Sequence, residues 1–292
     1  MKQFVVLGLG RSGSNLLVNR LNTPGSVCFG EIYHPVDIYL QFPVPGFEVA
    51  YPDGDSLLNS LRVRYDQRLM QMSTRRTMMY YALLGLPVHA CSTKIKRDKD
   101  PVGYLRALHT QVVARYPAKH AWGFKLFLHH SSRILNYVCA NPDYAVLILR
   151  RRNLLARYSS KKKASITGTY RIAAGGSSSG CDQPVEFDPI EFRRLIRRDD
   201  KLFSQLYKKL DKHGKTFHEI EYCELGSPEA MAGVFAHLGI EGRASEDIRV
   251  QKQGSAYDML ERFSNPDDVV RYVETNGMEA WLHEQSPRLQ PA

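Results

Sequence analysis

The sequence of 292 residues has no apolar run long enough to cross a bilayer and no two cysteines in C-x-x-C spacing. A transmembrane helix needs about 20 consecutive apolar residues, so we expect no transmembrane segment. The five cysteines are dispersed and odd in number, which argues against a disulfide framework and a zinc site and favours a reducing compartment. The apolar run that follows Met1 stops at Arg11, too early for a signal peptide, and a strand explains it better.

The sequence also lacks a basic tail or a basic stripe with interleaved aromatic residues, although its net charge is +10. Such segments are typical of proteins that bind nucleic acids, so a basic nucleic-acid-binding protein is the least favoured functional class. An anionic cofactor and an anionic or polar acceptor would account for part of the positive charge. We assign the rest, including the charged run 93–100, to solvated turns and surface.

Apolar and polar segments alternate in a pattern typical of an α/β protein. With 43% hydrophobic residues, the chain 1–292 can bury a sizeable core as one domain. The pattern predicts a doubly wound, mostly parallel sheet of about five strands flanked by helices. We expect strands at 26–29, 122–127, 145–150 and 216–222, and helices at 101–115, 192–210, 228–238 and, as a pair, 265–283.

Two polar segments interrupt this alternation. The loop 41–54 is rich in proline, glycine and aromatic residues, and the segment 165–188 is rich in glycine and serine. Long loops near a site often shape it or close over it. We therefore expect a substrate pocket at the first segment and a substrate-side lid at the second.

The first predicted strand runs into a turn built on Gly8, Gly10 and Gly13, and a helix opens at Ser14. A loop of this kind turns several backbone N–H groups toward one point, which suits a bound phosphate or sulfate. Arg11 adds a permanent charge and a donor fork matched to a tetrahedral anion. Small hydrogen-bonding side chains follow at Ser12, Ser14 and Asn15.

Two well-known nucleotide loops can be compared with this turn. A Walker-type loop requires a lysine that is missing here, so a kinase or GTPase is not expected. A Rossmann dinucleotide site fits the glycine spacing, and Glu31 follows the next apolar run, where a ribose-binding acid should lie. The turn alone therefore leaves an NAD(P)-dependent oxidoreductase open.

A second anion-binding motif lies in the segment AVLILRRRNLLARYSSKKKA. An apolar strand runs into Arg150, Arg151 and Arg152, and a helix-forming segment then carries Ser159 and Ser160. An arginine at a strand end and a serine two turns into the next helix can reach one phosphate. Two separate anion sites suit a ligand that is phosphorylated at both ends, whereas the diphosphate of NAD would not need the second.

With RSGSNLL, RRNLLARYS and the weaker echoes GFK, EYCEL, HLGI and KQ in this order, the chain resembles the PAPS-dependent sulfotransferases, particularly the bacterial carbohydrate type. The resemblance implies a P-loop-like sulfotransferase fold and transfer of a sulfuryl group from 3′-phosphoadenosine 5′-phosphosulfate (PAPS) to a hydroxyl group. The acceptor would be a carbohydrate, a glycolipid or another small molecule, and no metal would be needed. A cytoplasmic bacterial enzyme is expected, with a homodimer left open.

The resemblance also assigns roles to residues. The 5′-phosphosulfate would be held by Arg11, Ser12, Gly13, Ser14 and Asn15. Arg151 and Ser159 would hold the 3′-phosphate, with Arg150 as the alternative arginine, and a late basic loop with Arg249 and Lys252 would add to that contact. Arg11 would also stabilise the leaving phosphate oxygen.

The acid–base group is expected just beyond the strand at 26–29. Sulfuryl transfer, like phosphoryl transfer, depends on positioning, charge stabilisation and a base for the hydroxyl proton. Glu31 is the favoured base and His34 the alternative. Lys125, inside an apolar strand, and His129 are expected to face the acceptor, and because adjacent residues of an extended chain point opposite ways, at most one of His129 and His130 should do so.

Overall fold

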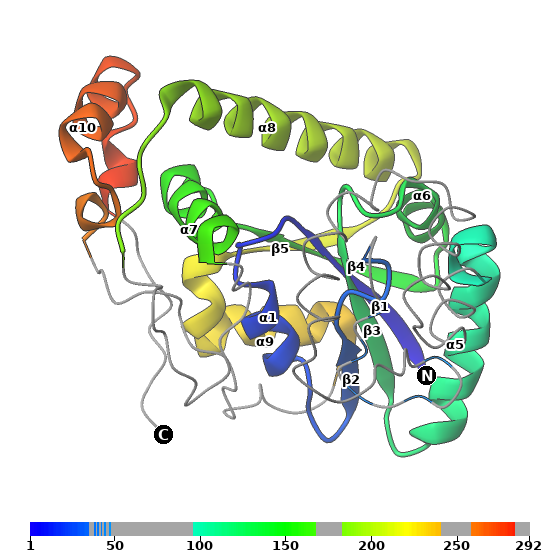
Figure 1. The fold of residues 1–292 in the computed structure, drawn as a ribbon. Coiled ribbons are helices and arrows are strands. Elements are labelled where there is room, and N and C mark those ends of the chain that lie inside the picture. Colours follow the sequence, from blue (N-terminus) through cyan, green and yellow to red (C-terminus); the bar gives the residue numbers. More distant parts are fainter. Residues whose placement is uncertain are drawn as a thin grey trace, which may run out of the picture.

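The computed structural model describes residues 1–34, 38, 40, 42, 44, 47, 96–167, 183–240 and 258–283. Its centre is a sheet of five strands in the order β2-β3-β1-β4-β5 (Figure 1). Every pair of neighbouring strands is parallel, so all five carboxyl ends lie at the same edge. The strands are β1 Lys2–Gly8, β2 Ser26–Phe29, β3 Ala121–Phe127, β4 Tyr144–Arg150 and β5 Phe217–Glu221. The predicted parallel five-stranded sheet is confirmed.

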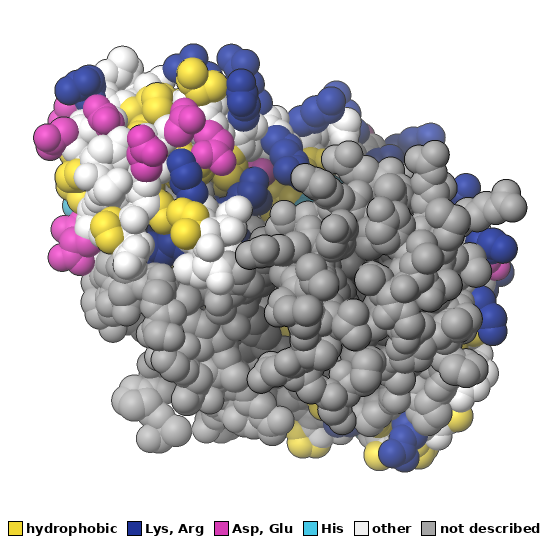
Figure 2. Space-filling view, viewed as in Figure 1, with side chains coloured by type: hydrophobic (Ala, Val, Ile, Leu, Met, Phe, Trp, Pro, Cys, Tyr) yellow, Lys and Arg dark blue, Asp and Glu magenta, His cyan; other side chains and the backbone are white. Residues whose placement is uncertain are grey.

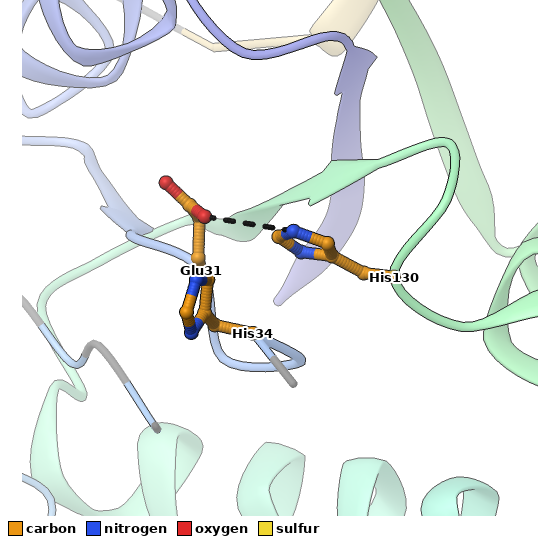
Figure 3. Close-up of side chains that lie close together, drawn as sticks. All are labelled: Glu31, His34 and His130. Carbon is orange, nitrogen blue, oxygen red and sulfur yellow. Dashed lines mark ion pairs between the residues drawn. The ribbon is translucent and has the colours of Figure 1, made fainter. Parts of the chain in front are cut away.

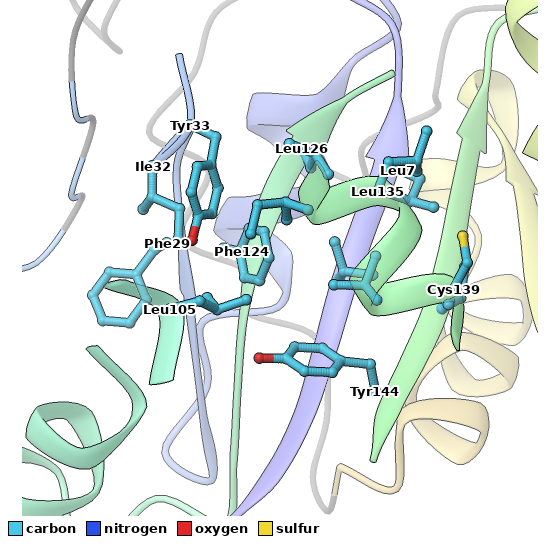
Figure 4. Close-up of a cluster of buried hydrophobic side chains, with 14 of the residues drawn as sticks. Leu7, Phe29, Ile32, Tyr33, Leu105, Phe124, Leu126, Leu135, Cys139 and Tyr144 are labelled. Atoms are coloured by element: carbon cyan, nitrogen blue, oxygen red, sulfur yellow. The ribbon is translucent and has the colours of Figure 1, made fainter. Parts of the chain in front are cut away.

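Helices cover both faces of this sheet, as a doubly wound fold requires. One face packs against α5 Pro101–Arg115, α6 Ser132–Ala140 and the C-terminal half of α8 Pro189–Lys212, and Figure 4 shows part of that cluster. The other face packs against α1 Ser14–Arg20 and α9 Pro228–Leu238. Strands buried on both faces are expected to be almost continuously apolar, and β1 and β4 follow this pattern. No helix of the described residues is long and apolar enough to cross a membrane.

Besides the two hydrophobic clusters on the faces of the sheet, a third, smaller one lies beyond the sheet edge. It joins α7 Leu154–Thr167, the N-terminal half of α8 and α10 Pro266–Thr275. Its aromatic rings include Tyr158, whose centroid is 5.3 Å from that of Phe192. Because α8 contributes to this cluster and to the main core, the helix ties the two together (Figure 1).

Most predicted element boundaries agree with the structure to within three residues. The strand at 26–29 and the helices at 101–115 and 228–238 are confirmed, and Gly239 ends α9 with φ 61. The helix α8 begins at Pro189, earlier than predicted, because Asp188 caps it by accepting hydrogen bonds from the next backbone N–H groups. The expected terminal helix pair is only half right, since α10 is followed by the short 3-10 turn η3 Glu279–Leu282.

The predicted substrate loop and lid fall mainly outside the described residues. Within 41–54, Val44 is fully buried, and the ring of Phe47 lies 5.1 Å from that of Tyr104. Val44 therefore belongs to the core, and Phe47 packs against it. Of the segment 165–188, the first three residues end α7 and the last six lead into α8, and residues 168–182 lie outside the described part.

Charged side chains that are spread along the sequence form groups of one sign on the surface. Dark blue Lys and Arg side chains lie along α8 in Figure 2, and acidic side chains gather over α10. Exposed cations of α8 between residues 193 and 201 are Arg193, Arg194, Arg197, Arg198 and Lys201.

Candidate active site

The glycine turn connects β1 to α1 at the carboxyl edge of the sheet. Gly13 has φ 84, and a Cβ added there would lie 2.5 Å from a ring carbon of Tyr222, so only glycine fits. Arg11 is the one non-glycine residue of the described part with positive φ, at 68°. Such backbone conformations cost about 1–3 kcal/mol and tend to occur at functional sites. The buried Ser12 side chain closes the turn by donating a hydrogen bond to the carbonyl of Leu9.

The second predicted motif meets the first at this turn. One guanidinium nitrogen of Arg151 donates to the carbonyl of Arg11 at 2.8 Å. Nε of Arg11, in turn, donates to Oγ of Ser160, another residue of the second motif, at 2.9 Å. Arg151 is nearly buried, and its guanidinium lies 4.4 Å from the ring centroid of Tyr222. The adjacency of β1 and β4 in the parallel sheet is what brings these distant segments together.

The three consecutive arginines have different surroundings. Arg150 packs its guanidinium 4.2 Å from the ring of Phe203 on α8 and donates to the hydroxyl of Tyr207 at 3.2 Å. Arg152 is 69% exposed and pairs with Glu219 at 2.9 Å. Of the three, Arg151 is the one that contacts the turn directly.

The two serines of the motif also have different hydrogen-bond partners. Ser159 is buried, and its hydroxyl donates to the carbonyl of Ala156 at 3.0 Å within α7. Ser160 instead accepts the hydrogen bond from Arg11. The serine that contacts the turn in this structure is therefore the neighbour of the one assigned by resemblance.

A further arginine, Arg157, clamps the turn and was not predicted. Its Nε donates to the carbonyl of Gly10 at 2.8 Å, and its guanidinium forms an ion pair with the buried Asp199 of α8. Burial, with the nearby Arg151 and Arg198, lowers the pKa of Arg157 to about 10. These groups border a small recess that is open to solvent, lined by Leu9, Ser12, Leu149, Arg150, Arg151, Leu154, Arg157, Asp199, Asp200 and Phe203.

On the other side of the turn, Lys125 joins Glu31 to α1. Its ammonium nitrogen lies 2.9 Å from Oε1 of Glu31 and donates to Oδ1 of Asn15 at 2.6 Å. The lysine is buried, and a buried charge needs such partners. The anion that the lysine faces is Glu31, the predicted base, and its expected contact with an acceptor stays a prediction.

Two histidines, His34 and His130, lie beside Glu31 (Figure 3). We call this group of side chains, with Lys125, the acidic corner of the site. Nε2 of His130 lies 3.9 Å from Oε2 of Glu31, and the ring of His34 stands edge-on to that of His130 at 5.2 Å. Burial, followed by the neighbouring His129, His34, Lys125 and Arg97, lowers the pKa of His130 to about 2. The imidazole of His130 is consequently neutral at physiological pH.

The expectation that His129 and His130 point opposite ways is wrong. The chain turns after β3, where the N–H of His130 donates to the carbonyl of Phe127 at 2.9 Å, and the two histidine rings lie 4.7 Å apart. His130, rather than His129, is the histidine beside Glu31. The alternation rule fails here because it holds only for extended chain.

Arg97 holds the segment that carries the acid and His34. One of its nitrogens donates to the carbonyls of Ile32 and His34, both at 3.0 Å, and its side chain is 2% exposed. The charged run 93–100 was predicted as solvated turn, and for Arg97 this is wrong because the guanidinium satisfies backbone carbonyls inside the protein. Arg249 and Lys252 lie outside the described residues.

The strand order bears on the dinucleotide alternative. In a Rossmann fold, the strand that carries the acid is the direct neighbour of the strand with the glycine turn. Here β3 lies between β2 and β1, and the carboxylate of Glu31 is engaged by Lys125. The arrangement is that of a doubly wound α/β protein with a polar site at its carboxyl edge, but without the Rossmann strand order. The chain matches no known family model and no curated protein.

Proposed function

We propose that this protein is a PAPS-dependent sulfotransferase that transfers a sulfuryl group to a hydroxyl of a carbohydrate or glycolipid. The observation that supports this most is the order of groups along one sheet edge. Glu31 lies beyond β2, Lys125 lies near the carboxyl end of β3, the glycine turn lies beyond β1, and Arg151 lies beyond β4. A carboxylate, the glycine turn and a second cation are therefore at neighbouring strand ends, and this order supports transfer from a doubly phosphorylated donor.

In the proposed complex, the turn and Arg11 hold the 5′-phosphosulfate, and the arginine after β4 holds the 3′-phosphate. Arg151 is better placed for this than Arg150, because it already contacts the turn, whereas Arg150 packs on α8. On the serine side, both Ser159 and Ser160 remain candidates, since the hydroxyl of Ser160 is the one near Arg11.

The proposed reaction forms one sulfur–oxygen bond and breaks another. The acceptor oxygen attacks sulfur in line with the leaving phosphate oxygen, and its proton passes to Glu31, with His34 as the alternative base. The bonding electrons of the broken bond stay on that phosphate oxygen, where Arg11 and the turn amides stabilise the charge. Lys125 contacts both Glu31 and Asn15, and so keeps the base close to the donor loop.

The proposal is tested by incubating the protein with ³⁵S-labelled PAPS and a panel of carbohydrate and phenolic acceptors. Thermal unfolding with adenosine 3′,5′-bisphosphate (PAP) or NADP gives a parallel test that needs no acceptor. A ligand at 100 times its Kd stabilises the fold by about 2.7 kcal/mol, and we expect this from PAP only. Stabilisation by NADP alone, with no labelled product, would replace this proposal with the oxidoreductase.

The cations along α8 favour a polyanion ligand. Nucleic-acid binding there would show an affinity that falls steeply with salt and would need no PAPS. Titrating a labelled duplex and a labelled single strand at two salt concentrations therefore separates this function from sulfuryl transfer.

A further inference from the structure

Three potential metal ligands meet at the acidic corner of the site, although they come from two distant segments. Glu31 and His34 follow β2, and His130 follows β3. One donor atom from each lies within 4.8 Å of the other two (Figure 3). Within the described residues, no other group of His, Cys, Asp and Glu comes together in this way.

We propose that Glu31, His34 and His130 form a binding site for one divalent transition-metal ion, with Zn²⁺ as the best-fitting ion. Two imidazoles and one carboxylate are a common zinc donor set, and they leave a fourth position for water. Two ligands about 2.0–2.1 Å from a tetrahedral ion are about 3.3 Å apart. The 3.9 Å between Nε2 of His130 and Oε2 of Glu31 is longer than this value, so the side chains would have to draw together around the ion.

The two oxygens of Glu31 have different neighbours. Oε1 faces the ammonium of Lys125 at 2.9 Å, whereas Oε2 faces His130. Lys125 thus orients the carboxylate and leaves Oε2 directed at the histidines. Partners of this kind, one step beyond the ligands, commonly orient metal-binding side chains.

The polar atoms of His130 supply an independent reason for a ligand. The side chain is 3% exposed, and Nδ1 is buried with no hydrogen-bond partner among the described residues. Nε2, at 3.9 Å from the carboxylate, is beyond hydrogen-bond length. Buried polar groups in native proteins are normally satisfied. An ion bound to Nε2 would give that nitrogen a partner beside Glu31, whereas Nδ1 would keep the surroundings it has in this structure.

The backbone of the same corner is fixed before any ion binds. Arg97 bridges the carbonyls of Ile32 and His34, and this holds the short segment between Glu31 and His34 in one conformation. The charge of Glu31 is already paired with Lys125, so attraction depends mainly on the imidazole nitrogens. We therefore expect Zn²⁺ and Co²⁺ to bind, and Mg²⁺, which prefers oxygen ligands, to be excluded.

A bound ion would occupy Oε2, the oxygen that is directed away from Lys125. If Glu31 is the base, Zn²⁺ should inhibit sulfuryl transfer, and this consequence alone rests on the proposed function. Metal binding itself does not, because it can be measured without PAPS or acceptor.

The test is a titration of the untagged, chelator-treated full chain with Co²⁺, read by its visible d–d absorption, followed by displacement with Zn²⁺. We expect one Co²⁺ per chain, displacement by Zn²⁺ and no displacement by Mg²⁺. His34→Asn and His130→Asn should each weaken Co²⁺ binding by more than about 100-fold, beyond the 10–100-fold typical when a residue that only orients a metal ligand is changed. The matched control, His213→Asn, changes an exposed histidine at the end of α8 and should leave binding unaltered.

Unchanged Co²⁺ affinity in the His34 variant, or displacement by Mg²⁺, would overturn the proposal. Circular dichroism identifies a misfolded His130 variant, and His34→Asn still decides the question because that side chain is only half-buried. The two proposals fail separately. Absent labelled product with intact Co²⁺ binding removes the sulfotransferase, and absent Co²⁺ binding with labelled product removes the metal site.

Discussion

The guanidinium of Arg151 donates a 2.8 Å hydrogen bond to the carbonyl of Arg11, a residue 140 positions away in the sequence. This contact joins the glycine turn after β1 to the arginine motif after β4. In the proposed enzyme, the groups that hold the two ends of one nucleotide would lie next to each other. The first consequence concerns Arg151 itself.

Arg151→Ala should weaken PAP binding by about 10–100-fold, because a hydrogen bond to a charged group contributes about 1.5–3 kcal/mol. Calorimetric titration of PAP measures this. Arg152→Ala is the matched control, since its side chain is 69% exposed and pairs with Glu219, and it should change Kd little. Equal effects in the two variants would mean that general positive charge, and not Arg151, attracts the nucleotide.

Glu31→Gln should keep PAP binding and lower turnover by about 10²–10⁴-fold, the range typical of a general base. The glutamine has nearly the same shape but cannot take the hydroxyl proton. Initial rates with labelled PAPS, together with the Kd of PAP, separate the two effects. Normal turnover in this variant, with loss in His34→Asn, would assign the base to His34.

Asp199→Asn should destabilise the fold by about 3–5 kcal/mol, because it leaves the buried guanidinium of Arg157 without its counter-charge. Urea unfolding measures the loss. Asp200→Asn, at the exposed neighbouring position, should change stability by less than about 0.5 kcal/mol. The double variant Arg157→Met/Asp199→Leu should be more stable than Asp199→Asn, and a double variant that is less stable would contradict this explanation.

Gly13→Ala should destabilise the protein by more than about 1 kcal/mol, since alanine is strained at positive φ and its Cβ would meet Tyr222 at 2.5 Å. Gly214→Ala is the control for backbone strain alone, because Gly214 has φ 56 and nothing lies within 4 Å of the added Cβ. Comparing the thermal unfolding of both variants shows how much of the lost stability comes from the steric clash with Tyr222. Similar losses at the two positions would show that the turn can shift away from Tyr222.

Much of the fold could be predicted because it depends on local patterns. The apolar strands, the glycines of the turn and the glycine after α9 report directly on backbone conformation. The meeting of the turn with Arg151 followed from one rule, that parallel strands end at the same edge. The strand order itself was not predicted, and it is the feature that separates the structure from a Rossmann fold.

The rest of the site depends on contacts between distant segments. The pair of Arg157 and Asp199 and the bridge made by Arg97 arise from helix packing that no local spacing encodes. The proximity of His130 to Glu31 depends on a turn after β3 that the extended-chain rule does not anticipate. A buried arginine inside a helix is visible in a sequence only as a charge on the apolar face, and this signal was available for Arg157.

The central claim is that two separate cationic groups hold the two ends of one nucleotide at the glycine turn. It is tested most directly by measuring the affinities of PAP, 5′-AMP and 3′-AMP for the wild-type protein and for Arg151→Ala. The account predicts that PAP binds wild type far more tightly than either monophosphate, and that its advantage over 5′-AMP disappears in Arg151→Ala. Equal affinities of PAP and 5′-AMP in the wild-type protein would contradict it.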